Sequence, residues 1–498
     1  MLRSQSIRLL IIVLGLTIGI NALNGPGQAQ KPDNAFLAAV PRTWDDEALA
    51  LMTLPSANPG VHIVYVSSEY YYSIPVIPFY KSYPVYHPDK EPSGYLDWLK
   101  QEPEEIVFDA ARLKTETDWI KAGELIFDSQ FEFKPITEVR DSAWYKKIGA
   151  PLTKEGILPA YRYTTRKKGT IEVSAASCAY CHTRVLPDGT MVTGAQGNFP
   201  AERDYAYQLR KSGRLTPRLD SSLIFPAMRK DKLNQGLYSR TLEEVASAHE
   251  AIIPGVVARP GFSVLDMPKT ADLIGVKDRK YLDLTARLRH RSIGDLMRYA
   301  AMCAGTNYFF SSAASQLGSL PDPSSLARFS DEQLYALALY IYSLQPPSNP
   351  NKFDDQAARG QAVFKREGCA ICHTPPLYTN NKLTPAGQFQ VSDQHRNKYD
   401  ILDIRVGTDE RSALTSVRGR GYYKVPSLKG VWYRGPFEHN GSVATLEDWF
   451  DPRRTRDDYV PTGFVGYGVR RRAVKGHPFG LNLSVEDRKA LIVFLKTL

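Results

Sequence analysis

The chain has few cysteines, methionines and histidines: 5, 7 and 9 among 498 residues. No methionine follows Met302, and no tryptophan lies between Trp144 and Trp432. After the first 30 residues, no stretch has the roughly 20 apolar residues that a membrane-spanning helix needs. Nothing in the sequence resembles a nucleic-acid-binding module. These absences exclude a nucleic-acid-binding protein and a membrane span in the body of the chain.

Four of the five cysteines stand in two C-x-x-C-H motifs, at residues 178–182 and 369–373. Two thiols at this spacing can form thioethers with both vinyl groups of a haem, and the adjacent histidine reaches the iron. A thioredoxin-type redox pair, a shared zinc site or two tight disulfides would also use paired cysteines, but a histidine placed identically after both pairs argues against each of them. The motifs therefore predict two covalently bound haem c groups. The attachment residues would be Cys178, Cys181, Cys369 and Cys372, with His182 and His373 as proximal iron ligands.

The N-terminus is typical of a secretory signal peptide. Arg3 and Arg8 precede an apolar run from Leu9 to Ile20, and small residues follow at 27–29. An uncleaved membrane anchor is the alternative, but a run of about twelve residues is short for a span. We expect residues 1–29 to be cleaved and the protein to be periplasmic or secreted, which suits a bacterial c-type cytochrome.

The net charge is +10, and most of the excess lies in residues 353–498, which hold 23 Lys and Arg against 16 Asp and Glu. One interpretation is a basic docking face for an acidic electron partner, since opposed fields raise association rates. The other is that Arg453, Arg454 and Arg470–Arg472 neutralise haem propionates or are simply solvated.

Residues 30–109 are interpreted as an N-terminal arm. A short helix is expected over Asp45–Thr53 and a strand over Val61–Val66. From residue 55 to 95, tyrosines alternate with prolines, which break any long ladder of hydrogen bonds. We expect an extended arm that wraps a domain; an exposed partner-binding strip is the alternative.

An internal repeat predicts the architecture. Residues 330–344 align without gaps with residues 484–498, and both segments have a serine N-cap followed by a helical apolar stripe. Gly123 and Gly360 also correspond, and each could lie where two helices cross closely. We therefore expect a mainly α-helical protein with two cytochrome-c-like domains, at 110–347 and 353–498, each carrying one covalently attached haem, together with long loops and the extended arm. The first domain has 46 extra residues between its glycine and its haem motif.

The order of the motifs, together with residues 425–431 (VPSLKGV), 435–442 (GPFEHNGS) and 445–447 (TLE), resembles the di-haem cytochrome c peroxidase superfamily. That superfamily includes the methylamine-utilisation di-haem enzyme and the rubber oxygenases. The resemblance covers residues 110–498 and is strongest in the last 150. Residues 476–480 (GHPFG) are most similar to the rubber-oxygenase branch.

The resemblance implies that His477 is the distal ligand of the C-terminal haem. The sequence agrees, because residues 353–498 contain no methionine, and the other histidines there are His395 and His439. His439 lies in a loop that resembles an interdomain loop of the family, so a structural role is expected for it. Two imidazole ligands would make this haem an electron relay that reacts poorly with small ligands.

The sixth ligand of the first haem stays undecided from the sequence; the resemblance implies an open or water-bound site. Ile293–Cys303 is expected to form a helix, residues 307–310 could line a pocket, and the unpaired Cys303 is interpreted as a buried small hydrophobe. The candidate ligands are Met191, Met228, Met267, Met297, Met302, His249 and His290.

Two functions remain from the sequence. The first is an exported di-haem oxidoreductase with peroxidase-like or oxygenase-like chemistry at the His182 haem, acting on peroxide, dioxygen or an organic substrate. The second is a non-catalytic electron carrier. Expected partners are a small redox protein or a quinol-linked electron donor. A calcium ion, found in some relatives, cannot be placed, and Trp432 is the residue expected between the haems.

Overall fold

The computed structural model describes residues 39–498 except 60, 62, 131–133, 136–137, 175, 215–240, 258–266, 305–309, 312–319, 409, 417, 461 and 463–474. The predicted signal peptide at 1–29 and the predicted pocket residues 307–309 lie outside the described residues. Within the described ranges, no helix combines the length and the apolarity needed to cross a membrane.

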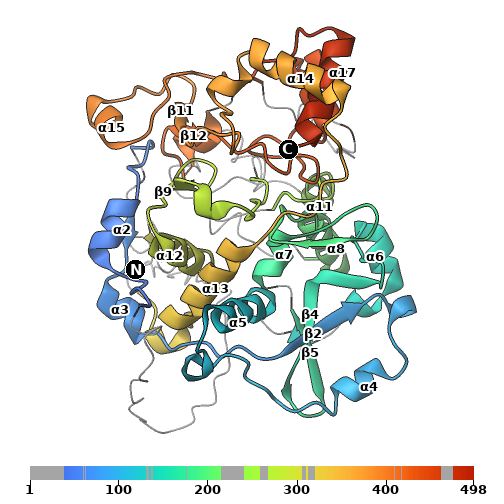
Figure 1. Ribbon diagram of the computed structural model, residues 1–498. Helices are drawn as coiled ribbons and strands as arrows, with labels where there is room; N and C mark the ends of the chain where they lie inside the picture. Colours follow the sequence, from blue (N-terminus) through green and yellow to red (C-terminus); the bar gives the residue numbers. More distant parts are fainter. Residues whose placement is uncertain are drawn as a thin grey trace, which may run out of the picture.

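Two pairs of crossing helices organise the structure (Figure 1). Helix α5 (Glu116–Asp128) packs on α13 (Asp331–Ser343), and α14 (Asp355–Arg366) packs on α17 (Val485–Lys496). A Cβ atom on Gly123 would lie 2.0 Å from the carbonyl oxygen of Ala336, and one on Gly360 would lie 2.0 Å from that of Ala490. Since Ala336 and Ala490 are equivalent in the repeat, the predicted close crossings are confirmed. The assignment of two separate domains stays a prediction.

The two closing helices begin as the sequence predicts. The Ser330 hydroxyl accepts the Gln333 N–H at 3.1 Å, and the Gln333 side chain accepts the Ser330 N–H at 2.7 Å. Ser484 likewise accepts the Asp487 N–H at 3.1 Å. The Asp487 carboxylate turns instead to α14, where it accepts hydrogen bonds from two arginines, Arg359 and Arg366.

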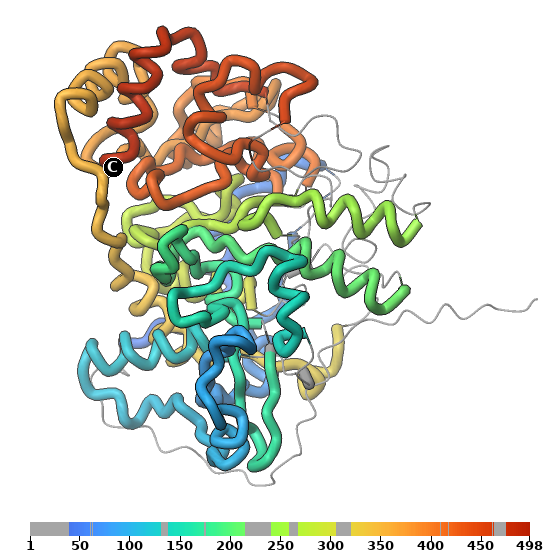
Figure 2. The backbone as a smooth tube through the Cα atoms, turned by 90° about the vertical axis from the view of Figure 1, so that its right-hand side faces the viewer, coloured from blue at the N-terminus to red at the C-terminus, as the bar shows by residue number. Residues whose placement is uncertain are grey.

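A four-stranded antiparallel sheet combines one strand of the N-terminal arm with three strands from the insertion between Gly123 and Cys178, and the sequence did not predict it. Its order is β2 (Ser82–Tyr86), β4 (Ile157–Lys167), β5 (Thr170–Ser174) and β3 (Lys134–Pro135). In Figures 1 and 2 the sheet lies at the opposite end of the molecule from α14 and α17. Among the described residues, helix accounts for 39% and strand for 12%, so helix predominates over strand.

The N-terminal arm is only partly extended. Its predicted first helix is present as α2 (Asp46–Met52), and the predicted strand is short, β1 (Val64–Tyr65). Tyr70, Tyr71 and Tyr72 lie in a helix, α3 (Ser68–Ser73), which the sequence analysis did not expect. Tyr71 is buried and stacks on Trp44 with ring centroids 4.7 Å apart. The arm then passes α13, where Gln333 donates to the Ile77 carbonyl at 2.9 Å.

Helix α12 (Ile293–Ala304) confirms the helix predicted at 293–303. Cys303, however, is exposed near its end, so the expectation of a buried cysteine was wrong. The remaining helices are α4 (Tyr95–Leu99), α6 (Ser142–Ile148), α7 (Cys178–His182), α8 (Ala201–Ser212), α11 (Leu242–Glu250), α15 (Asp393–Lys398) and α16 (Leu446–Trp449). The remaining strands are β6 (Thr183–Val185), β7 (Met191–Thr193), β8 (Tyr281–Leu282), β9 (Leu288–Arg289), β10 (Phe310–Ser311), β11 (Leu383–Pro385) and β12 (Tyr422–Lys424).

Candidate haem sites

The second C-x-x-C-H motif begins just after α14. Gly368 takes a left-handed conformation with φ of 73°, which turns the chain into the short 3₁₀ helix η8 (Cys369–Ile371). The His373 N–H closes this turn on the Cys369 carbonyl at 2.9 Å. The turn therefore carries the two cysteines and the histidine of the motif on one short segment.

Backbone carbonyls fix the tautomer of His373. Its Nδ1 lies 3.2 Å from the Tyr378 oxygen and 3.1 Å from the Pro426 oxygen. A carbonyl can only accept, so Nδ1 carries the proton and Nε2 keeps its lone pair. Burial lowers the pKa of His373 to about 4, so the ring is neutral near pH 7. A neutral imidazole oriented by a carbonyl is the usual form of a metal-binding histidine.

His477 faces His373, with ring centroids 6.4 Å apart. An imidazole nitrogen binds a metal ion at about 2.0–2.1 Å, and the ring centroid lies roughly 1 Å behind it, so two imidazoles on opposite sides of one ion have centroids about 6 Å apart. Burial and the neighbouring His373 lower the pKa of His477 to about 3, and its buried Nδ1 has no hydrogen-bond partner. The two rings fit a shared iron; their roles as haem ligands stay predictions.

The loop that carries His477 is tightly held. Arg454 donates to the carbonyls of Trp449 (2.7 Å), Gly476 (3.0 Å) and His477 (2.7 Å). On the other side, the His477 N–H donates to the Val406 carbonyl at 2.5 Å. Arg454 is fully buried, so the interpretation of Arg454 as simply solvated was wrong, whereas a contact with a haem propionate stays a prediction. Nothing in the charge pattern distinguished Arg454 from its exposed neighbour Arg453, which pairs with Asp451.

The other two histidines of the C-terminal part have different surroundings. The Nδ1 of His395, on α15, lies 2.9 Å from the Tyr422 hydroxyl. His439 is buried and stacked on Tyr423 with centroids 4.9 Å apart. His477 is therefore the histidine among these three that the structure brings to His373.

The first motif forms α7 and leads directly into β6. The Cys181 carbonyl accepts the Gly197 N–H at 3.1 Å, and the His182 carbonyl accepts the Gly194 N–H at 2.7 Å, so the following loop folds back over the motif. The Nδ1 of His182 lies 2.8 Å from the Ala271 oxygen. His182 thus has the same carbonyl orientation as His373. In the sequence, Pro426 lies in the segment 425–431 that carries the family resemblance. Nothing in the sequence around Ala271 indicated that its carbonyl would orient a histidine.

The thiols do not fit a redox-active pair. Burial raises the pKa of Cys178 to about 12 and that of Cys369 to about 11, whereas reactive dithiols have a lowered pKa. All four motif cysteines are free, without disulfides. The described part of the chain also contains no group of three or more Cys, His, Asp or Glu side chains that could hold a metal ion together, as a zinc site would need.

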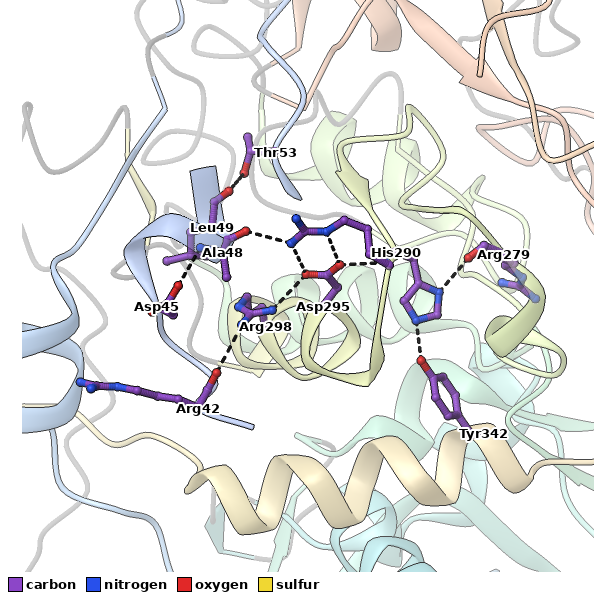
Figure 3. Close-up of polar contacts among 11 residues, drawn as sticks. Arg42, Asp45, Ala48, Leu49, Thr53, Arg279, His290, Asp295, Arg298 and Tyr342 are labelled. Atoms are coloured by element: carbon purple, nitrogen blue, oxygen red, sulfur yellow. Dashed lines mark hydrogen bonds and ion pairs between the residues drawn. The ribbon is translucent and has the colours of Figure 1, made fainter. Parts of the chain in front are cut away.

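Several candidates for the sixth position of the first haem have structural contacts. Figure 3 shows that both ring nitrogens of His290 are engaged: Nδ1 lies 2.8 Å from the Arg279 oxygen and Nε2 lies 2.6 Å from the Tyr342 hydroxyl. His249 lies 2.6 Å from Glu202. Met297 and Met302 are in the core around α13, and Met267 packs against Ile252 and Val256. Met191 is half exposed beside a cavity of about 320 Å³ that Ala179 also lines, and Met228 lies outside the described residues.

The loop at residues 435–442 connects the N-terminal part of the molecule, which carries the first motif, with the C-terminal part, which carries the second. In residues 435–442, the Gly435 carbonyl accepts from Arg184 at 2.8 Å, and the Pro436 carbonyl accepts from Gln196 at 2.8 Å. Trp432, just before the loop, packs in a cluster with Val192, Ala195 and Ile274 of the first half. Trp432 therefore lies where the two halves meet.

Comparison with known proteins shows what parts of the chain are similar to. Residues 421–460 match the family model described as RoxA-like, cytochrome c-like. This agrees with the rubber-oxygenase resemblance of the C-terminal part, and with the cytochrome c character that both motifs predict.

The chain is also similar to curated relatives. It is 30% identical over 162 residues to the cytochrome-c peroxidase IdrP1 of Denitromonas iodatirespirans, covering 29% of this chain and 40% of that protein. It is 27% identical over 144 residues to the methylamine utilization protein MauG of Methylorubrum extorquens, covering 28% and 34%. The chain thus spans less than half the length of these relatives. The matches confirm the predicted resemblance to di-haem cytochrome c peroxidases and the methylamine-utilisation enzyme.

Among solved structures, a MauG-like protein associated with microbial copper homeostasis aligns with a TM-score of 0.29 and 15% identity, covering 46% of this chain and 73% of that one. A likeness of this size adds no argument about function.

Proposed function

We propose that this protein is an exported di-haem c-type cytochrome that acts as an oxidoreductase. The observation that carries the proposal is the His373–His477 pair, with ring centroids 6.4 Å apart. Neither ring is charged near pH 7, and His373 is oriented by two carbonyls. Similarity to cytochrome c peroxidases and MauG supports an enzyme.

The second haem would be attached through Cys369 and Cys372 and held by His373 and His477. The chain's role at this site is to supply two neutral imidazoles and to exclude water. Arg454 and the Val406 carbonyl keep the His477 loop in place. Because His373 and His477 would both bind the iron, a haem held here would be suited to electron relay rather than to binding peroxide or dioxygen.

The first haem would be attached through Cys178 and Cys181, with His182 oriented by the Ala271 carbonyl. A haem with a vacant position supplies peroxide or dioxygen chemistry. The surrounding chain would position the proximal imidazole and admit the oxidant, and possible reductants are a small redox protein, a quinol-linked donor or an organic substrate. A calcium ion remains without an assigned position.

Low-temperature EPR of the resting ferric protein tests the proposal. We expect one high-spin signal from the first haem and one low-spin signal with two nitrogen ligands from the second. The His477→Ala variant should lose the low-spin signal, whereas His395→Ala, which changes a histidine on α15, should keep it. Two low-spin haems that stay inert to peroxide and dioxygen, including after partial reduction, would instead make the protein an electron carrier.

Export is part of the proposal and is tested separately. The mature N-terminus of protein purified from the periplasm or the medium should begin near residue 30. A protein that is recovered with residues 1–29 intact would contradict cleavage.

A further inference from the structure

A partly open cavity of about 110 Å³ lies between the two candidate haem sites. Its lining includes Ala271, whose carbonyl orients His182, and Pro426, whose carbonyl orients His373. The cavity is therefore next to the backbone that supports both proximal histidines. Its volume is well below the roughly 300–1,000 Å³ of common small-molecule pockets, so it suits one or two small polar groups rather than a whole organic substrate.

Four cations line this cavity: Lys269, Arg279, Lys424 and Arg434. Two carboxylates line it as well: Asp283, whose ion-pair partner lies outside the lining, and Asp272, which lies beside one of the four cations. Asp283 pairs with the buried Arg418 at 2.8 Å. Asp272 accepts the Tyr433 hydroxyl at 3.3 Å and the Ile274 N–H at 3.0 Å, and it lies 3.6 Å from Arg434. The lining thus has more positive charge than its own carboxylates offset.

The four cations mainly contact neutral groups. Lys424 donates to the Tyr281 carbonyl at 3.4 Å, and Lys269 lies 6.0 Å from the centre of the Phe437 ring. Arg279 donates to the carbonyls of Asp272 and Ile274. The buried Nε of Arg434 has no hydrogen-bond partner. Neutral acceptors satisfy hydrogen bonds but do not cancel buried charge.

Electrostatics agrees with this shortage of negative charge. Burial, together with the nearby Arg279 and Lys269, lowers the pKa of Lys424 to about 7. Burial and Arg434 lower the pKa of Lys269 to about 8. Each lysine would regain its ordinary charge if a carboxylate entered the cavity, because an adjacent negative charge favours the protonated amine.

We propose that this cationic cavity is a binding site for carboxylate groups, held by Lys269, Lys424, Arg279 and Arg434. Arginine guanidinium groups bind carboxylates through paired N–H donors, and lysines add point charges. The carboxylates can come from two sources: the propionate side chains of a haem, or a free small dicarboxylate. The binding of haem propionates rests on the proposed function, whereas the binding of a free dicarboxylate does not.

The sign of a stability change tests the proposal. If a carboxylate occupies the cavity, Lys424→Met removes one partner of a buried ion pair and destabilises the protein; if the cavity holds no anion, the same change removes a repelled cation and stabilises it. We expect the thermal midpoint of the purified full-length protein to fall by several degrees in Lys424→Met. Lys424→Arg should keep most of the midpoint, and Lys429→Met, at an exposed lysine of the same loop, should leave it unchanged. A midpoint that rises or stays the same in Lys424→Met, together with no effect of succinate on the midpoint of the wild-type protein, would overturn the proposal. Lys269→Met provides the same test if Lys424→Met does not fold.

Succinate distinguishes the two sources. If the ligand is a free dicarboxylate, succinate raises the midpoint of the wild-type protein and not that of Lys424→Met. If the ligands are propionates, succinate has no effect, and Lys424→Met lowers the reduction potential of a haem because a positive charge beside it is lost. Covalently bound haem, measured on the denatured protein, checks the proposed function independently. If the protein contains no covalently bound haem, the succinate titration alone decides whether the cavity binds carboxylates.

Discussion

The guanidinium of Arg454 donates to the carbonyl oxygen of His477 at 2.7 Å, from a position with no exposed surface. The same side chain holds the carbonyls of Trp449 and Gly476. One buried arginine thus determines where the candidate distal histidine lies.

Replacement of Arg454 should release the His477 loop. Arg454→Leu removes a donor from three partly buried carbonyls, and each polar group left buried without a partner costs about 1–3 kcal/mol. We expect a lower free energy of unfolding and a smaller low-spin fraction in the EPR spectrum. Arg453→Leu is the matched control, because the Arg453 side chain is 72% exposed. A low-spin signal that is unchanged in Arg454→Leu would show that the loop does not depend on this arginine.

Gly476 should not tolerate a side chain. It has a φ of 111°, and a Cβ atom there would lie 2.2 Å from the carbonyl carbon of Gly407. Gly476→Ala should therefore displace His477 and reduce the low-spin signal. Gly275→Ala is the control, since Gly275 also has a positive φ, of 70°, but no atom lies within 4 Å of its added Cβ. Gly275→Ala should lower the free energy of unfolding, measured by chemical denaturation, by only about 1–2 kcal/mol, which is the cost of a left-handed backbone conformation for alanine. Equal losses in the two variants would contradict the close approach at Gly407.

The helix crossing at Gly360 should be equally sensitive. Gly360→Ala would place Cβ 2.0 Å from the Ala490 oxygen, so α14 and α17 must separate. Overpacking of this kind costs about 1–3 kcal/mol. Gln361→Ala, at the next residue of α14, should be close to neutral because alanine favours helices. Gly123→Ala should repeat the loss at α5 and α13, and a neutral result at either glycine would mean that the helices have room to shift.

Trp432 lies where the two halves of the chain meet, so it should affect electron transfer between the haems. Trp432→Phe keeps an aromatic ring but removes the indole, and we expect slower equilibration between the haems after rapid partial reduction. Trp98→Phe, at a half-exposed tryptophan of α4, should leave the rate unchanged. A rate unaffected by Trp432→Phe would remove this residue from the path.

The sequence predicted what depends on repetition and spacing. The alignment of residues 330–344 with 484–498 needs no structure, and it placed Gly123 and Gly360 at the crossings. The position of His477 opposite His373 followed from family resemblance and from the lack of methionine after Met302. These features are local patterns, or repeats of such patterns.

The features that the sequence did not predict depend on contacts between distant residues. Arg453 and Arg454 are the same residue type in adjacent positions, yet only the tertiary fold buries one of them. Ala271 acts through its backbone carbonyl, so its side chain carries no signal. The helix of Tyr70–Tyr72 did have a signal: the Ser67 hydroxyl accepts the Tyr70 N–H at 3.2 Å, as an N-cap does.

The sheet in the first half gives the N-terminal arm a protective role. Strand β2 of the arm pairs along the 11-residue strand β4 and itself forms the edge of the sheet. The edge strand is short and contains Pro84, which has no N–H to offer to another chain. Proteolytic loss of the arm would uncover the long edge of β4, where strands of neighbouring molecules could add. The arm therefore covers the edge of β4 as well as completing the sheet.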